Sequence, residues 1–221
     1  MHKHLLALCL LAACSTAPAQ PPTTSPAIAA IAPVAAADTT VYDLAARRAL
    51  AIGWLHDYAV AATYPTDGAG APISVFVDAK GVRCPMAELV FRSGRADLVA
   101  AVQRDNNAVR LADVNAGPLH DWMRGSGLTR AEINMIQGAM NIDMGWLQDA
   151  QLGLGSTIAM QAQVRGKLEI AEVALRDNTA AALAQAAKQL PPAADVDDLV
   201  HAPIVGAVVQ PSPLRARLAR R

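Results

Sequence analysis

The sequence has little of what a large β-sheet core or a cross-linked fold requires. Aromatic residues account for only 4% of its 221 positions, and it contains three cysteines. The hydrophobic fraction of 53% is inflated by alanine, so the composition favours helices packed through small residues over a sandwich or barrel. The 19 basic and 19 acidic residues cancel, so net charge alone excludes no class of partner.

Long hydrophobic runs are also absent. A helix needs about 20 apolar residues to cross a bilayer. The run from Leu5 to Leu11 is much shorter, and Pro33 interrupts the alanine-rich stretch that follows residue 26. The sequence therefore predicts no membrane-spanning helix.

The N-terminus carries an export signal. Met1 to Lys3 form a short basic region, Leu5 to Leu11 an apolar core, and small residues follow at 12 and 13. With Cys14 next, residues 11–14 (LAAC) resemble the lipobox of bacterial lipoprotein precursors. This resemblance implies a thioether-linked diacylglycerol on Cys14 and an acylated N-terminus, which would hold the mature chain on a lipid bilayer.

Ser15 bears on the destination of the chain. In the lipoprotein family an aspartate directly after the cysteine marks retention at the inner membrane, so Ser15 implies the outer membrane of the bacterial envelope, facing the periplasm. An ordinary secretory signal is the alternative, because residues 17–19 (APA) also form a small-x-small cleavage site. That signal would give a secreted or soluble periplasmic protein. Both interpretations predict export.

Composition divides the chain into four parts. Residues 1–13 are the expected signal peptide, 14–38 a lipid anchor with a Pro-, Ala- and Thr-rich tether, 39–190 one helical domain, and 191–221 a disordered basic tail. Basic side chains at the end of that tail could remain solvated or contact an anionic envelope surface: Arg215, Arg217, Arg220 and Arg221.

The predicted fold is mainly α-helical, with one small β-hairpin and a long C-terminal helical hairpin. The β-branched stretch 73–77 and residues 82–83 flank a turn at 78–81, which is typical of a β-hairpin. A three-four spacing of apolar residues between 164 and 186 predicts long helices that end at Pro191. Another helical stripe runs from Val41 to Ala59, although Arg48 lies on it.

Cap signals locate further helices. Pro85 fits the first turn of a helix and places Cys84 at its N-cap, and Pro118 opens a short helix that carries Trp122. Thr129 and Glu132 form a capping box. The helix that it opens has an apolar stripe of Ile133, Ile136, Met140, Met144 and Leu147.

The central segment is similar to a pattern in uncharacterised exported bacterial proteins. The similarity rests on residues 76–81 (FVDAKG), 84–87 (CPMA), 93–94 (SG) and on the stretch from Asp97 to Asn107. These are mostly turn and capping residues, and the resemblance implies no activity.

Cys84 is the main chemical candidate. Cys9 leaves with the signal peptide and Cys14 is lipidated or removed, so Cys84 is the single free thiol of the exported chain. A helix N-terminus and Arg83 favour its thiolate, whereas Glu88 opposes it. Three roles remain open: a packed structural thiol, an intermolecular disulfide, or the nucleophile of a thiol-dependent enzyme.

Two histidines are the other candidates. His56 and His120 are each followed by aspartate, which suggests a metal or small-ligand site or a base for the thiol. Adjacent helical residues point about 100° apart, so neither His-Asp pair chelates alone and the two pairs would have to meet. Solvent-facing or capping roles are the simpler interpretation. The sequence predicts no cofactor.

The function most consistent with the sequence is a lipid-anchored envelope protein that acts through protein contacts without catalysis. The alternatives are a thiol-dependent enzyme that uses Cys84 and a metal or small-ligand binder that uses His56 and His120. Residues 127–129 (GLT), just before a predicted helix, resemble the turn of a helix-turn-helix motif. The sequence nevertheless predicts no nucleic-acid partner, because the chain is expected to be exported and has no basic recognition face.

Overall fold

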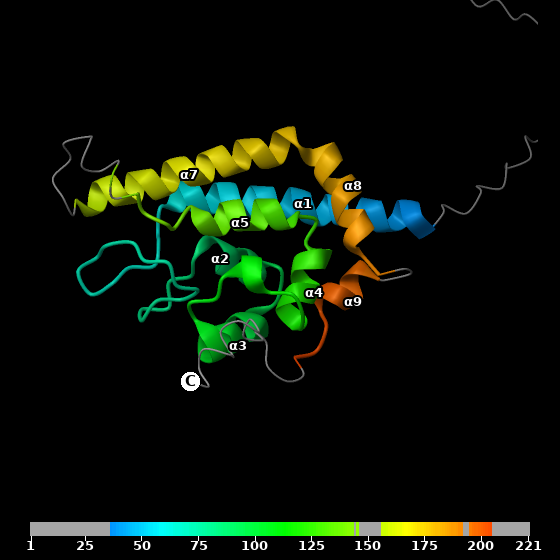
Figure 1. Cartoon of the computed structure of the whole chain (residues 1–221), viewed down its shortest axis with the longest axis horizontal. Coiled ribbons are helices and arrows are strands. Elements are labelled where there is room, and N and C mark those ends of the chain that lie inside the picture. Colours follow the sequence, from blue (N-terminus) through cyan, green and yellow to red (C-terminus); the bar gives the residue numbers. More distant parts are fainter. Residues whose placement is uncertain (1–35, 144, 146–155, 192–194, 205–221) are drawn as a thin grey trace, which may run out of the picture. The chain divides into compact units, whose positions relative to one another are not determined.

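The backbone is mainly α-helical, as predicted (Figure 1). The computed structural model describes residues 36–143, 145, 156–191 and 195–204. The described helices, in chain order, are α1 (Ala36–Ala61), α2 (Pro85–Arg92), α3 (Ala96–Asn106), the 3-10 turn η1 (Leu111–Asp113), α4 (Pro118–Gly125), α5 (Arg130–Gly138), α7 (Thr157–Asp177), α8 (Thr179–Gln189) and α9 (Val196–Val200). Among these residues, no helix combines the length and apolar character that a bilayer crossing requires.

The predicted helix caps are present. Cys84 is the N-cap of α2 with Pro85 behind it, and its sulfur accepts a hydrogen bond from the backbone N–H of Ala87. Thr129 and Glu132 form both hydrogen bonds of the capping box that opens α5. These caps satisfy N–H groups that a helix leaves without partners in its first turn. Local sequence therefore determines where α2 and α5 begin.

Helix α1 lies at the centre of the packing and contacts α2, α7, α8 and α9. The predicted stripe is buried at Leu44, Ile52, Leu55 and Ala59, while Val41 is 40% exposed. Helix α7 lies along α1 and also contacts α5 (Figure 1). Its own buried stripe is Val164, Leu168, Ala171 and Leu175.

The long C-terminal helices differ from a simple hairpin. They are separated at Asn178, which ends α7 and precedes α8, and both helices pack on α1. Because α1 supplies the apolar face that each one covers, the two helices do not need each other as partners. Helix α5 is also shorter than expected, since it ends at Gly138. Met140 is buried in the core, and Met144 and Leu147 lie outside the described residues.

The predicted β-hairpin reduces to one bridge between Val77 and Arg83, and the described residues contain no sheet. Asp78 holds the turn because its carboxylate accepts hydrogen bonds from the backbone N–H groups of Lys80 and Val82 at 2.8 Å. The side chain of Asn107 bonds to both the N–H and the C=O of Val77. The two arms keep two backbone bonds, from Asp78 N–H to the Val82 carbonyl and from Cys84 N–H to the Phe76 carbonyl. Asn107 at the end of α3 therefore occupies the outer edge of the first arm, where a further strand would pair.

The tail prediction is wrong for residues 195–204, which include the packed helix α9. Asp195 caps this helix, and Val196 and Val200 are buried against the domain. The contacts of α9 are to α4 and α1. The four arginines at 215, 217, 220 and 221, Cys14 and the expected signal peptide and tether up to residue 35 lie outside the described residues.

One buried charged residue joins four parts of the fold. Arg48 of α1 is 1% exposed and forms a bidentate ion pair with Glu132 of α5, with N–O distances of 2.6 and 2.9 Å. Its guanidinium also donates to the backbone oxygens of Gly127 and Leu175. The remaining N–H contacts the hydroxyl of Thr179 at 3.4 Å. Arg48 therefore ties α1 to α5, α7, α8 and the turn between α4 and α5.

Candidate functional site

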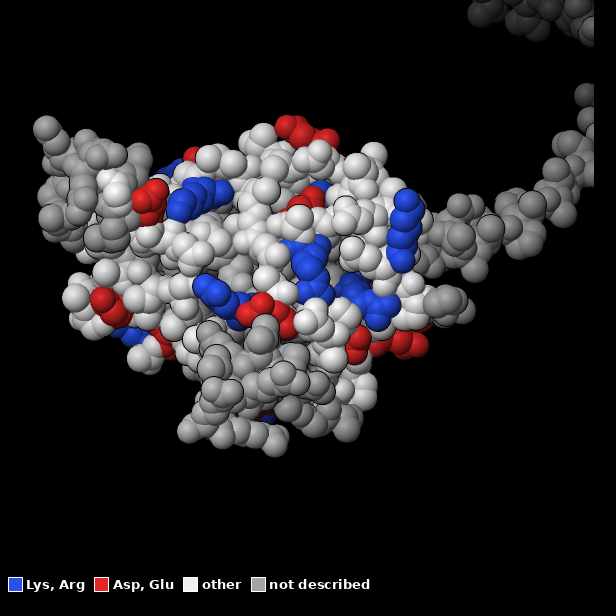
Figure 2. Space-filling model, in the orientation of Figure 1, with Lys and Arg blue, Asp and Glu red and all other residues white. Residues whose placement is uncertain are grey.

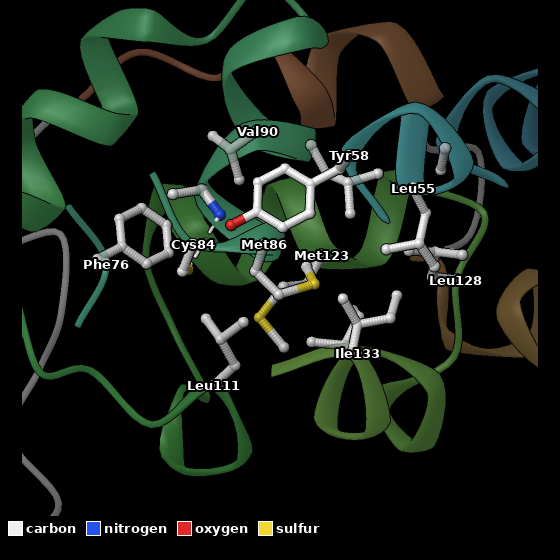
Figure 3. Packing of buried hydrophobic residues seen from close by; sticks show 14 of the residues in the cluster. Leu55, Tyr58, Phe76, Cys84, Met86, Val90, Leu111, Met123, Leu128 and Ile133 are labelled. Carbon is white, nitrogen blue, oxygen red and sulfur yellow. Dashed lines mark hydrogen bonds between the residues drawn. The ribbon is translucent and has the colours of Figure 1, made fainter. Parts of the chain in front are cut away.

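The thiol of Cys84 is enclosed in the main hydrophobic cluster. Phe76, Met86 and Val90 belong to the same cluster, and Figure 3 shows them grouped around the α2 N-terminus. Cys84 is 3% exposed, and its backbone N–H donates to the carbonyl of Phe76 at 2.9 Å. Access to a solvent-borne substrate would require this part of the core to open.

Burial raises the pKa of Cys84 to about 11, although backbone N–H groups at the helix start pull it down. Arg83 does not offset this effect, because its guanidinium bonds to Glu88 at 2.6 Å and lies 3.8 Å from the ring centroid of Phe91. Near neutral pH the group is therefore the protonated thiol, which is a poor nucleophile. These observations favour the packed structural thiol among the three roles.

Thiol labelling measures this directly. In a chain with Cys9 and Cys14 replaced by serine, we expect an aromatic disulfide reagent at pH 7.5 to label native Cys84 at least 100-fold more slowly than the urea-unfolded chain. A Gly53→Cys change in a Cys84→Ser background supplies an exposed reference thiol on α1. Equal rates for Cys84 and this reference would contradict a buried thiol.

The two histidines have separate contacts. His56 on α1 pairs with Glu172 of α7, with Nδ1 and Oε2 3.0 Å apart, and it is exposed. His120 on α4 has its own neighbour Asp121 at 4.0 Å. Burial and the nearby charges of Arg124 and Arg130 lower the pKa of His120, which favours neutral imidazole. No group of three or more His, Cys, Asp or Glu residues within the described ranges could hold a metal ion. Neither histidine has Cys84 as a hydrogen-bond partner.

A groove between α1, α2, α4 and α9 offers a better candidate site. It consists of two hollows of about 240 and 500 Å³ that share Arg47 and Leu50, and we call it the α1–α9 groove. The smaller hollow is mostly apolar and is lined by Leu50, Ala51, Trp54, Leu89, Trp122 and Val200, with Arg47, Arg92, Ser93 and Ser126. The larger hollow adds Asp43, Ala46, Asp195 and Asp197.

Fixed contacts hold the apolar part of this groove. The indole N–H of Trp122 donates to the hydroxyl of Ser93 at 2.8 Å, and that hydroxyl donates to the carbonyl of Val90. Trp122 is therefore buried with its polar atom satisfied. In contrast, Leu50 is 53% exposed beside it. An exposed leucine next to an ordered aromatic wall is the arrangement that an apolar side chain of a partner can cover.

The rim of the α1–α9 groove is acidic. Arg47 pairs with Asp197 of α9, and Arg92 pairs with Asp57 at 2.8 Å and with Glu88 at 2.9 Å. Burial alone would raise the pKa of Glu88, but hydrogen bonds from Arg83 and Arg92 outweigh it and hold that pKa below its usual range. Glu88 is therefore held as the carboxylate beside Arg92 at the edge of the groove.

Five carboxylates lie in or beside the groove, since Asp43 and Asp195 in the larger hollow join the three that pair with arginine. Three arginines balance them in part, because Arg83 also pairs with Glu88. The local excess is two negative charges. Across the face in view, Figure 2 shows acidic and basic side chains scattered among much uncharged surface. The acidic excess at the groove is a local property of a chain whose total formal charge is zero.

Sequence reasoning did not identify this groove. Its lining comes from four helices spread between residues 43 and 200, and one of them lies in a segment expected to be disordered. The available signal was the spacing of Asp43, Arg47, Leu50 and Trp54, which places all four on one face of α1. Comparisons of the chain with family models, curated proteins and solved structures return no match.

Proposed function

We propose that this chain is a lipoprotein of the bacterial cell envelope, anchored through Cys14, and that it binds a partner protein through the α1–α9 groove. The anchor is supported by the LAAC motif after a basic and apolar N-terminal segment. The groove is the observation that carries the binding role. Its apolar wall, exposed Leu50 and acidic rim supply an anchor pocket together with electrostatic steering.

The partner segment carries an apolar side chain flanked by lysine or arginine. The smaller hollow, at about 240 Å³, lies below the range of about 300–1,000 Å³ that is typical of sites for whole small molecules. It has room for one large side chain. The carboxylates along the rim then face the basic residues on either side of that anchor.

Peptide titration tests the groove. We expect the full chain with Cys14→Ser to bind a fluorescent amphipathic Leu/Lys peptide, and Leu50→Ala to weaken binding at least fivefold through lost apolar contact area. Val60→Ala is the matched control, because Val60 is 58% exposed on the same helix and does not line the groove. A Leu/Glu peptide of the same pattern should not bind. Equal losses for the Leu50 and Val60 variants would exclude the groove as the site.

Intact mass tests the anchor separately. The chain extracted from bacterial membranes should carry the mass of a diacylglycerol and an acyl chain, and Cys14→Ala should abolish both the added mass and membrane association. A native chain without acyl mass would refute the anchor while leaving the peptide result unaffected.

A further inference from the structure

A polar hollow lies between α5 and the segment that follows α3 and contains η1. Its volume of about 470 Å³ falls within the range of about 300–1,000 Å³ that is typical of sites for whole small molecules. None of its described lining residues belongs to the α1–α9 groove, and none is aromatic. The polar side chains among them are Ser74, Arg110, Asp113, Asn134, Gln137 and Asn141.

The wall formed by residues 108–113 is held to α5 without any ligand. The side-chain amide of Gln137 accepts a hydrogen bond from the backbone N–H of Leu111 at 2.8 Å and donates to the carbonyl of Val109 at 2.7 Å. The side chains of Val109 and Leu111 are buried in the core. The backbone on both sides of Arg110 is therefore fixed, which is the support that a preformed binding site needs.

This wall presents two opposite charges. Arg110 and Asp113 lie at the two ends of η1, line the hollow and are exposed. Neither side chain has a hydrogen bond or an ion pair within the described part of the chain. In contrast, Arg165 and Arg176 on α7 each pair with a glutamate four positions away. The hollow thus offers a guanidinium and a carboxylate that are both available to a ligand.

The opposite wall, on α5, carries an unsatisfied amide. The side-chain oxygen of Asn134 is buried and has no hydrogen-bond partner among the described residues. A buried oxygen without a donor destabilises a protein, and such an atom in a native structure requires an explanation. Asn141 lines the same hollow beyond the end of α5. A bound molecule with its own N–H or O–H groups would provide the missing donor.

We propose that this hollow binds a free α-amino acid with a polar, uncharged side chain. Arg110 binds the α-carboxylate, for which the planar guanidinium is well suited, and Asp113 binds the α-ammonium. The amides of Asn134 and Asn141 both donate and accept, so they match a side-chain amide or hydroxyl. A neutral sugar would leave both charges without a partner. The site goes beyond the proposed function, because it depends on neither the anchor nor the α1–α9 groove.

NMR titration of the full ¹⁵N-labelled chain with Cys14→Ser tests the site with L-glutamine as the probe. We expect shifts of the backbone amides in residues 108–113 and in α5. L-Glutamine amide lacks the carboxylate and N-acetyl-L-glutamine lacks the ammonium, so each should bind at least tenfold more weakly through loss of one charge-assisted contact. The proposal is overturned if L-glutamine at about 10 mM shifts none of these amides, since binding that weak amounts to no specific site. Equal binding of L-glutamine and N-acetyl-L-glutamine would also overturn it.

Charge variants assign each end of the probe. Arg110→Met should weaken L-glutamine binding at least tenfold and leave binding of L-glutamine amide unchanged, because that probe has no carboxylate to lose. Asp113→Asn should weaken L-glutamine binding and leave N-acetyl-L-glutamine unchanged. Arg104→Met is the matched control, because Arg104 is an exposed arginine that does not line the hollow. If Arg104→Met and Arg110→Met have equal effects, Arg110 is not the carboxylate ligand.

Filling the hollow is an independent measurement. Gly138 lines it, and a Cβ atom added there would meet nothing within 4 Å. Gly138→Phe should therefore fold normally and abolish L-glutamine binding, whereas Gly53→Phe, at an equally open glycine on α1, should leave it unchanged. Full binding by Gly138→Phe would place the ligand elsewhere and refute the site.

Asn134→Leu separates a binding role from a structural one. The substitution removes the unsatisfied oxygen, so the ligand-free chain should unfold at a higher urea concentration, while binding of L-glutamine weakens. A structural role for the amide predicts the opposite change in stability. Lower stability of Asn134→Leu with unchanged binding would exclude Asn134 from the site.

Discussion

Arg48→Met is expected to lower the free energy of unfolding by about 3–5 kcal/mol, because it leaves the buried carboxylate of Glu132 without its cation. The residue is 1% exposed and donates to Glu132, Gly127 and Leu175, so the substitution also removes donors from two buried carbonyl oxygens. Urea denaturation followed by circular dichroism measures the loss. A change below about 1 kcal/mol would show that the pair contributes little.

A double variant separates the charge from the packing. Glu132→Gln keeps the residue type that a capping box accepts at this position, so the start of α5 can survive. Replacing both partners, as Arg48→Met with Glu132→Gln, removes both charges and should recover more than half of the stability lost in Arg48→Met. The double-mutant cycle then isolates the coupling between the two residues.

The pH dependence of the same variants follows from the pKa of Glu132. Burial alone would raise this pKa, but Arg48 and Thr129 outweigh burial and hold it below its usual range. The pair therefore stabilises the native protein above the unfolded pKa of about 4.3, and this contribution is lost as pH falls through the lower folded pKa. In Arg48→Met the pKa of Glu132 rises. The stability difference between the two proteins should thus be largest near pH 7 and shrink toward pH 4.

Local signals in the sequence predicted those parts of the fold that local contacts determine. The caps of α2 and α5 depend on residues within three positions, and both are confirmed. The apolar stripe on α1 was also predicted from the sequence. The position of Arg48 on that stripe was not explained, because its partner Glu132 lies 84 positions away. Side-chain spacing along one helix cannot identify such a partner.

The incorrect predictions have a common physical origin. The β-branched segment before Asp78 has the composition of a strand, but it pairs with the second arm only at the bridge between Val77 and Arg83, and Asn107 at the end of α3 binds its outer edge. Helix α9 has only five residues, so its apolar pattern is limited to Val196, Leu199 and Val200 in an acidic segment. In both cases distant parts of the chain decide the structure of a short segment whose own preference is weak.

The candidate site was the least predictable feature. Cys84, His56 and His120 were conspicuous because their side chains are reactive, yet the structure buries the first and gives the histidines separate acidic neighbours. The α1–α9 groove is built from ordinary apolar and charged residues instead. Only the packing of α4 and α9 against α1 and α2 brings Trp122 and Val200 beside Leu50.

Gly127→Ala is expected to destabilise the protein by about 3 kcal/mol, the largest effect of any single-methyl change in the described domain. Gly127 has a φ of +75° and lies in the turn between α4 and α5. A Cβ atom there would be 2.3 Å from the carbonyl oxygen of Leu44 and 3.0 Å from the backbone nitrogen of Arg48. The left-handed conformation costs about 1–2 kcal/mol for alanine, and overpacking adds about 1–3 kcal/mol.

The backbone of α1 cannot move away from this methyl group without disturbing Arg48, whose guanidinium donates to the carbonyl of Gly127 itself. The clash and the ion pair are therefore coupled, and combining Gly127→Ala with Arg48→Met should cost less than the sum of the two separate losses.

Gly53→Ala is the control, because its Cβ would meet nothing within 4 Å, and it should add about 0.5–1 kcal/mol of stability. If Gly127→Ala unfolds at the same urea concentration as the unsubstituted chain, the turn does not approach α1 as closely as described. Additive losses in the combined variant would mean that the turn and the ion pair stabilise the domain independently.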